Sequence, residues 1–119
     1  MAAVLAVLAG GFLGGVARFG LSGLVAARVG ELFPWGTLVV NVTGAFLIGI
    51  FAGLSGSLGP LARDFLVVGF CGGYTTVSSF ALQTLALGLD GEGRGALLNV
   101  LGSAALSLVA VALGYWVAA

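Results

Sequence analysis

The chain has 119 residues, of which 61% are apolar and only 7% are charged, and its formal net charge is zero. Soluble domains carry about a quarter charged residues, which keep them dispersed in water. A chain this apolar, with a mean hydropathy of +1.25, suits a lipid bilayer instead. The zero net charge also excludes a basic surface for nucleic acid or for anionic lipid.

The first apolar stretch covers residues 2–22 and is interrupted only by Arg18. A secretory signal peptide is the alternative interpretation of this N-terminus, but the stretch has no basic start, and three further apolar stretches follow it. A short polar connection comes next. It contains Arg28 and the turn at residues 34–36, in which Trp35 suits the membrane interface.

Helix breakers and polar loops separate the later stretches. Residues 55–60 end the second one, and residues 90–95 form a flexible loop after the third. The third begins near Asp64, because a carboxylate is favourable at the positive end of a helix. A bilayer span needs about 20 apolar residues. The sequence therefore predicts an all-α integral membrane protein, a single domain over residues 1–119 with four transmembrane helices at 2–22, 37–54, 64–88 and 96–118.

The loops give almost no preference for one orientation in the membrane. Arg28 and Arg94 follow the first and third spans, whereas Arg63 follows the second, on the side of the N-terminal amine. Orientation depends on the asymmetry of Lys and Arg between loops, and here that asymmetry is about one charge. We therefore expect insertion either way up and an antiparallel, dual-topology dimer. The alternative is that so few charges leave the rule uninformative.

Many of the 22 glycines form pairs four residues apart. In lipid, small residues at this spacing let helix backbones approach closely and gain dispersion contacts. We interpret three pairs as simple helix packing: Gly10/Gly14, Gly11/Gly15 and Gly49/Gly53. The fourth pair, Gly69/Gly73, belongs to a segment of a different kind.

That segment, residues 69–80, reads GFCGGYTTVSSF and lies near the middle of the third span. Adjacent glycines followed by hydroxyl residues favour a break in the helix. A break at bilayer depth is tolerated only where protein or water satisfies the freed backbone groups, and its carbonyls can then bind a small hard cation such as sodium. A glycine-rich helix that stays continuous is the alternative.

Few polar side chains lie at membrane depth, where an unpaired amide or hydroxyl is costly. Asn41 lies a few residues inside the second span. Asn99, Ser103 and Ser107 share one face of the fourth span, because they follow a four-residue step. A single serine commonly bonds back to its own helix. The stripe of three indicates either a lined pathway or a helix contact, and the spacing alone does not separate the two.

Phe80 and Arg18 each have two interpretations. Most phenylalanines in such a chain face lipid, but an aromatic edge carries partial positive charge and contacts an anion without the strong trap of Lys or Arg. Arg18, late in the first span, either has a structural role, such as capping carbonyls, or sets the potential of a vestibule.

No catalytic constellation is present. The chain has no His and no Lys, and its acidic residues lie near span ends or in loops, so nothing activates a serine or Cys71 as a nucleophile. Metal-ligand spacing is also absent from the sequence. These features argue against an enzyme. A small dual-topology exporter needs a membrane-embedded carboxylate, which this chain lacks.

Three segments, in order, resemble the Fluc (CrcB) family of fluoride channels over nearly the full chain. Residues 10–19 (GGFLGGVARF) resemble the glycine–arginine motif of the family's first helix. Residues 36–46 (GTLVVNVTGAF) resemble the second-helix motif, and residues 69–80 resemble the third-helix signature. The last motif is specific, and three matches at the right spacing argue against coincidence.

The resemblance implies an antiparallel homodimer in the cell membrane (the inner or plasma membrane), with two pathways through which fluoride leaves the cytoplasm. It also implies a structural sodium ion, not transported, held by the backbone carbonyls of Gly72 and Thr75. The residues that match the family's ion pathway are Asn41, Phe80, Ser103 and Ser107.

Two positions depart from the family pattern. Val77 stands where the motif has its first phenylalanine, and Gln83 stands where a glutamate commonly follows the second. Either the pathway tolerates one ring per chain, or a different partner subunit supplies the missing groups, or conductance is reduced. A subunit without its own pore is a further alternative.

Overall fold

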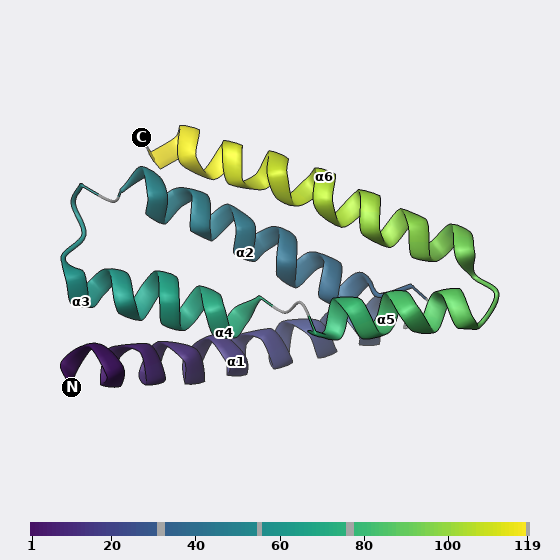
Figure 1. Ribbon diagram of the computed structural model, residues 1–119, viewed down its shortest axis with the longest axis horizontal. Helices are drawn as coiled ribbons and strands as arrows, with labels where there is room; N and C mark the ends of the chain where they lie inside the picture. The colour runs from purple at the N-terminus through teal and green to yellow at the C-terminus, as the bar shows by residue number, and fades with distance from the viewer. Residues whose placement is uncertain (31–32, 55, 76–77, 119) are drawn as a thin grey trace.

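The computed structural model describes residues 1–30, 33–54, 56–75 and 78–118, and within these ranges it contains helices and connections only (Figure 1). In the described part of the chain, three helices are long and apolar enough to cross a membrane: α1, α2 and α6. The predicted all-helical chain with several membrane-crossing helices is confirmed at this level. The helices are α1 (Ala2–Val29), α2 (Trp35–Gly53), α3 (Pro60–Arg63), the π-helical η1 (Asp64–Cys71), α4 (Gly72–Tyr74), α5 (Ser78–Leu89) and α6 (Gly93–Ala118).

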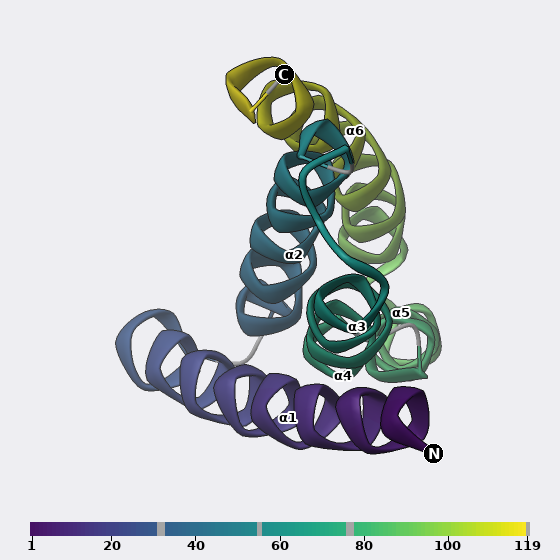
Figure 2. The same ribbon diagram turned by 90° about the vertical axis from the view of Figure 1, so that its left-hand side faces the viewer.

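The long helices run back and forth along a molecule about 48 Å in length, and both termini lie at the same end (Figure 1). α2 packs along α6, whereas α1 packs against η1 and α4. Viewed from the end, α1 crosses beneath the other helices (Figure 2). The turn between α5 and α6 uses Gly91 at φ 81°, a left-handed conformation that glycine adopts without steric cost.

α1 continues beyond the predicted first span. The expected polar connection begins only after Val29, so Arg28 lies in the last helical turn. A basic side chain is favourable there, because it faces the negative end of the helix dipole. The helix ends at Gly30, whose φ is 84° and whose N–H donates to the Ala26 carbonyl.

Glycines hold α2 and α6 in backbone contact. A methyl group added at Gly49 would overlap the carbonyl oxygen of Val111, and one added at Gly114 would overlap the carbonyl oxygen of Phe46. The two sites are reciprocal, one on each helix. Close approach of this kind gives dispersion contacts where lipid offers no hydrophobic drive for helix association.

A second set of glycines holds α1 against the third apolar segment. Gly10 and Gly14 are buried, and a side chain at either would overlap backbone atoms of η1. The packing prediction is therefore confirmed for these two and for Gly49, whereas Gly15 has nothing within 4 Å of an added methyl group. Gly73 is also a packing glycine, because an added methyl group would overlap the backbone of α1.

The third apolar segment is divided into pieces. It begins at Pro60, one turn before the predicted start at Asp64, because proline fits the first turn of a helix, where its missing N–H is not needed. Helix α4 ends at Tyr74, Thr75 is extended (φ −81°, ψ 155°), and α5 begins at Ser78. The helical axis is thus displaced between α4 and α5 (Figure 1).

Candidate ion pathway

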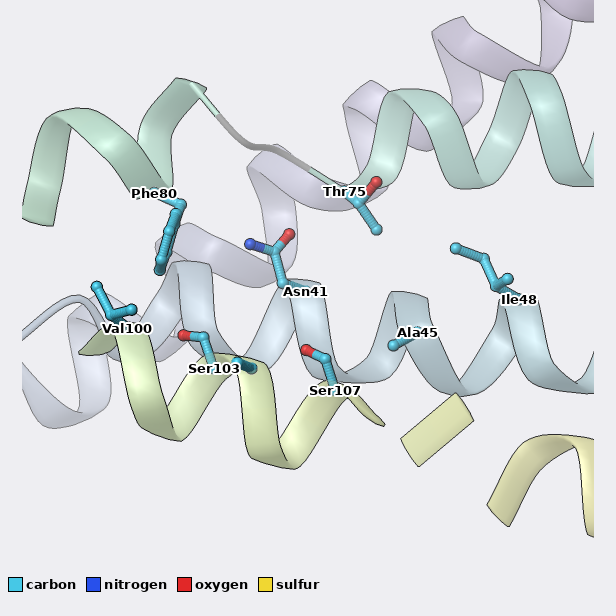
Figure 3. Close-up of a pocket in the computed structure, with 9 residues that line it drawn as sticks. Asn41, Ala45, Ile48, Thr75, Phe80, Val100, Ser103 and Ser107 are labelled. Carbon is cyan, nitrogen blue, oxygen red and sulfur yellow. The ribbon is translucent and has the colours of Figure 1, made fainter. Parts of the chain in front are cut away.

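A cavity of about 420 Å³ lies between α2, α6 and the region where α4 gives way to α5, and it is largely open on one side. Asn41 extends from α2 into the space between Phe80 and Thr75, and two serines face it from α6 (Figure 3). The cavity is lined by Asn41, Ala45, Ile48, Thr75, Phe80, Val100, Ser103, Ala104 and Ser107.

All of the pathway residues expected from the sequence meet in this cavity, although they come from segments far apart in the chain. They are Asn41, Phe80, Ser103 and Ser107. The apolar part of the wall was not anticipated. Ala45 and Ile48 follow Asn41 by one and two turns of α2, so the helical period could have identified them.

The polar stripe on α6 divides into two parts. Asn99 is fully buried, and its Nδ2 donates to Thr84 Oγ1 on α5 at 2.8 Å, so Asn99 forms a helix contact. Ser103 and Ser107 lie on the cavity wall. The helix-contact interpretation therefore holds for Asn99, whereas for Ser103 and Ser107 a lined pathway stays a prediction.

The helix end next to the cavity is held by several hydrogen bonds. Arg18 Nε donates to the Gly73 carbonyl at 3.2 Å, as a basic side chain does when it caps the C-terminus of a helix. Thr75 Oγ1 donates to the Cys71 carbonyl at 2.9 Å. Tyr74 and Thr43 share a hydrogen bond of 2.7 Å between their hydroxyl groups, which ties this end to α2.

Gly72 and Arg18 do not line the cavity. Gly72 is exposed, and a methyl group added there would meet nothing within 4 Å among the described residues. Its carbonyl and that of Thr75 belong to the end of a helix, where carbonyls lack intrahelical partners. Among the described residues, no three His, Cys, Asp or Glu side chains gather at a common point.

The cavity wall combines a few neutral polar groups with apolar side chains, and none of the described residues that line it is charged. Hydroxyl and amide groups can donate hydrogen bonds to an anion, and a ring edge adds a weakly positive surface. Neutral donors bind an anion less tightly than Lys or Arg, so the ion can also leave. The arrangement suits conduction better than storage.

The family model for CrcB-like proteins (camphor resistance, CrcB) matches residues 5–115. The chain belongs to the CrcB-like family. The chain is 59% identical to Fluoride-specific ion channel FluC 4 of Brucella abortus over 114 residues, which cover 92% of this chain and 86% of the relative. It is also 56% identical to Fluoride-specific ion channel FluC 2 of Rhodopseudomonas palustris (94% and 89% covered) and 53% identical to Fluoride-specific ion channel FluC of Opitutus terrae (97% and 91% covered).

The two departures from the CrcB-like pattern have different outcomes in the structure. Val77 lies outside the described residues. Gln83 lines a second cavity of about 330 Å³, near the start of α2, and its buried Oε1 has no hydrogen-bond partner within the described part of the chain. A buried acceptor in a polar cavity of this size has room for a water molecule as its donor.

Proposed function

We propose that this chain is a fluoride-selective ion channel that lets fluoride leave the cytoplasm by passive electrodiffusion. The observation that carries the proposal is the neutral cavity in which Asn41, Phe80 and Ser103 converge. Membership of the CrcB-like family, with relatives named as fluoride-specific channels, supplies the identity of the ion. The names of these relatives describe ion channels, so the proposal is a channel and not an enzyme.

The working unit is an antiparallel, dual-topology homodimer in the cell membrane. The segment from α3 to α5 serves as a fourth crossing, broken near Thr75. The cavity is largely open on one side, and a second copy over that side would complete its wall. The near tie of arginines between the two ends of the molecule supports insertion in both orientations.

Fluoride passes the cavity by exchanging water for a few protein donors. The Asn41 amide and the hydroxyls of Ser103 and Ser107 replace part of the hydration shell, and the Phe80 edge contacts the remainder. Each interaction is weak, and such a sequence of weak sites allows rapid exit. No covalent chemistry is involved.

A structural sodium ion fits the chemistry of the helix end beside the cavity. Hard cations prefer oxygen ligands, and the donor groups here are backbone carbonyls. In this proposal the carbonyls of Gly72 and Thr75 hold the ion, and the open space around Gly72 admits the same groups from the second copy. The ion would supply a positive charge that joins the two copies.

The first test is fluoride efflux from liposomes that contain only this purified chain, read with a fluoride electrode and repeated with chloride. We expect rapid fluoride efflux without comparable chloride efflux, because the relatives of this chain are named as fluoride-specific channels and the cavity offers only a few neutral donors. Well-folded dimers that release no fluoride would contradict a self-sufficient channel. They would favour a heterodimer, in which a different subunit supplies what Val77 and Gln83 lack, or a subunit without its own pore.

Sodium gives a second prediction. Replacing sodium by a large organic cation should weaken the dimer and reduce fluoride flux, because the carbonyls would face one another without a charge between them. Thr75→Ser should respond to sodium as the wild type does, since it keeps the backbone carbonyl. Identical flux and dimer stability in sodium-free buffer would remove the ion from the proposal.

A further inference from the structure

Three hydrogen bonds connect the N-terminal part of α5 to the cavity wall on α6. Thr84 Oγ1 donates to the Phe80 carbonyl at 2.7 Å, and Asn99 Nδ2 donates to Thr84 Oγ1 at 2.8 Å. Ser103 Oγ donates to Asn99 Oδ1 at 3.4 Å. Neither Thr84 nor Asn99 lines the cavity, whereas Phe80 and Ser103 do.

The network has a fixed direction. A hydroxyl group has one proton, and Thr84 gives its proton to the Phe80 carbonyl. Thr84 can therefore only accept from Asn99, which places the amide nitrogen of Asn99 toward α5. The amide oxygen of Asn99 then faces Ser103 and accepts a hydrogen bond from its hydroxyl group.

This direction determines what Ser103 offers to the cavity. While its proton points to Asn99, Ser103 presents only lone pairs to an ion, and lone pairs repel an anion. The bond is long, because hydroxyl hydrogen bonds typically measure about 2.7–2.8 Å. Rotation about the Cβ–Oγ bond of Ser103 can therefore redirect its hydrogen bond from Asn99 to an ion in the cavity at little cost in free energy.

We infer that Asn99 is a positioning residue: its amide oxygen accepts the Ser103 hydrogen bond when no ion is present, and Ser103 redirects this hydrogen bond to fluoride when the ion arrives. The inference rests on the proposed channel function. An anion that gains a hydrogen bond from Ser103 must displace the bond to Asn99, so Asn99 weakens the site. A shallow site is what conduction requires, because the ion must also leave.

The test measures single-channel fluoride current against fluoride concentration in planar bilayers. In Asn99→Leu the Ser103 hydroxyl group no longer donates to Asn99. The fluoride concentration that gives half-maximal current should therefore fall by about threefold, and by no more than about tenfold, because one hydrogen bond is involved. The shift should depend on the Ser103 hydroxyl group. Without that hydroxyl group, Asn99→Leu should have no further effect, so Asn99→Leu/Ser103→Ala and Ser103→Ala alone should saturate at the same fluoride concentration. A general loss of packing would not give tighter binding.

Thr84 provides an independent variant if Asn99→Leu does not fold, as judged by size-exclusion chromatography. Thr84→Val removes the acceptor that orients the Asn99 amide, so half-saturation should shift in the same direction. Thr84→Ser keeps the hydroxyl and should restore the wild-type value. Suppose that the wild type conducts fluoride, but the half-saturating fluoride concentration is unchanged or raised in both Asn99→Leu and Thr84→Val. That result would overturn this inference and leave the proposed channel function intact. A wild type without fluoride current would overturn the proposed function and this inference with it.

Discussion

Asn41→Asp should reduce fluoride current by a hundredfold or more. The carboxylate has nearly the shape of the amide and would place a negative charge on the cavity wall beside Phe80 and Ser103. Two unit charges about 4 Å apart interact by about 4 kcal/mol at the effective dielectric constant typical of protein sites, which corresponds to about a thousandfold. Single-channel current at constant fluoride measures the effect directly.

Asn41→Ser is the matched control, because it keeps a neutral donor and should retain current within about tenfold of the wild type. Lowering the pH provides a second control. Burial raises the pKa of a carboxyl group, so the introduced Asp loses its charge as the pH falls, and part of the current should return. Full current in Asn41→Asp at neutral pH would remove Asn41 from the pathway.

The cavity shows why its polar lining residues could be picked out from the sequence while their arrangement could not. Polar groups in a membrane segment are costly unless they are hydrogen-bonded or solvated, so the sequence alone marks Asn41 and the serines of α6 as candidate site residues. The four-residue step assigned Ser103 and Ser107 to one face of α6. Nothing in that spacing revealed where along α6 the neighbouring helix would end.

The outcome for Asn99 depends on that end. Helix α5 covers Ser78–Leu89 and packs against α6, so Asn99 meets Thr84 and becomes buried. Beyond the start of α5, the same face of α6 has the cavity beside it instead. The position of one helix terminus therefore divides a uniform stripe into a helix contact and a wall.

The adjacent glycines show a limit of reasoning from helix propensity. The adjacent glycines and the hydroxyl residues after them together favoured a break, yet Gly72 and Gly73 are helical and the extended residue is Thr75, the first of those hydroxyl residues. Gly73 packs against the backbone of α1, and tertiary packing overrides a propensity cost of about 1 kcal/mol. Gly72, in contrast, is exposed, and a methyl group added there would meet nothing within 4 Å among the described residues.

Gly114→Ala should destabilise the protein clearly, although it adds only one methyl group to α6. A methyl group at this position would overlap the Phe46 carbonyl oxygen and lie 3.0 Å from the Ile50 nitrogen, both backbone atoms of α2 that cannot rotate away. α2 and α6 must separate, which gives up the close contact on both sides of the crossing. Overpacking of this kind typically costs about 1–3 kcal/mol. Thermal unfolding in detergent, followed by circular dichroism, measures the loss.

Gly102→Ala is the matched control on the same helix, because a methyl group there meets nothing within 4 Å in the part of the chain that the structure describes. Alanine is a better helix former than glycine by about 1 kcal/mol, so this variant should be neutral or slightly more stable. If Gly102→Ala lowered stability as much as Gly114→Ala, loss of the α2–α6 contact could not explain the effect.

Because α2 carries Asn41 and α6 carries Ser103, separating the two helices should also widen the cavity. We therefore expect Gly114→Ala to lose selectivity for fluoride over chloride before it loses its fold.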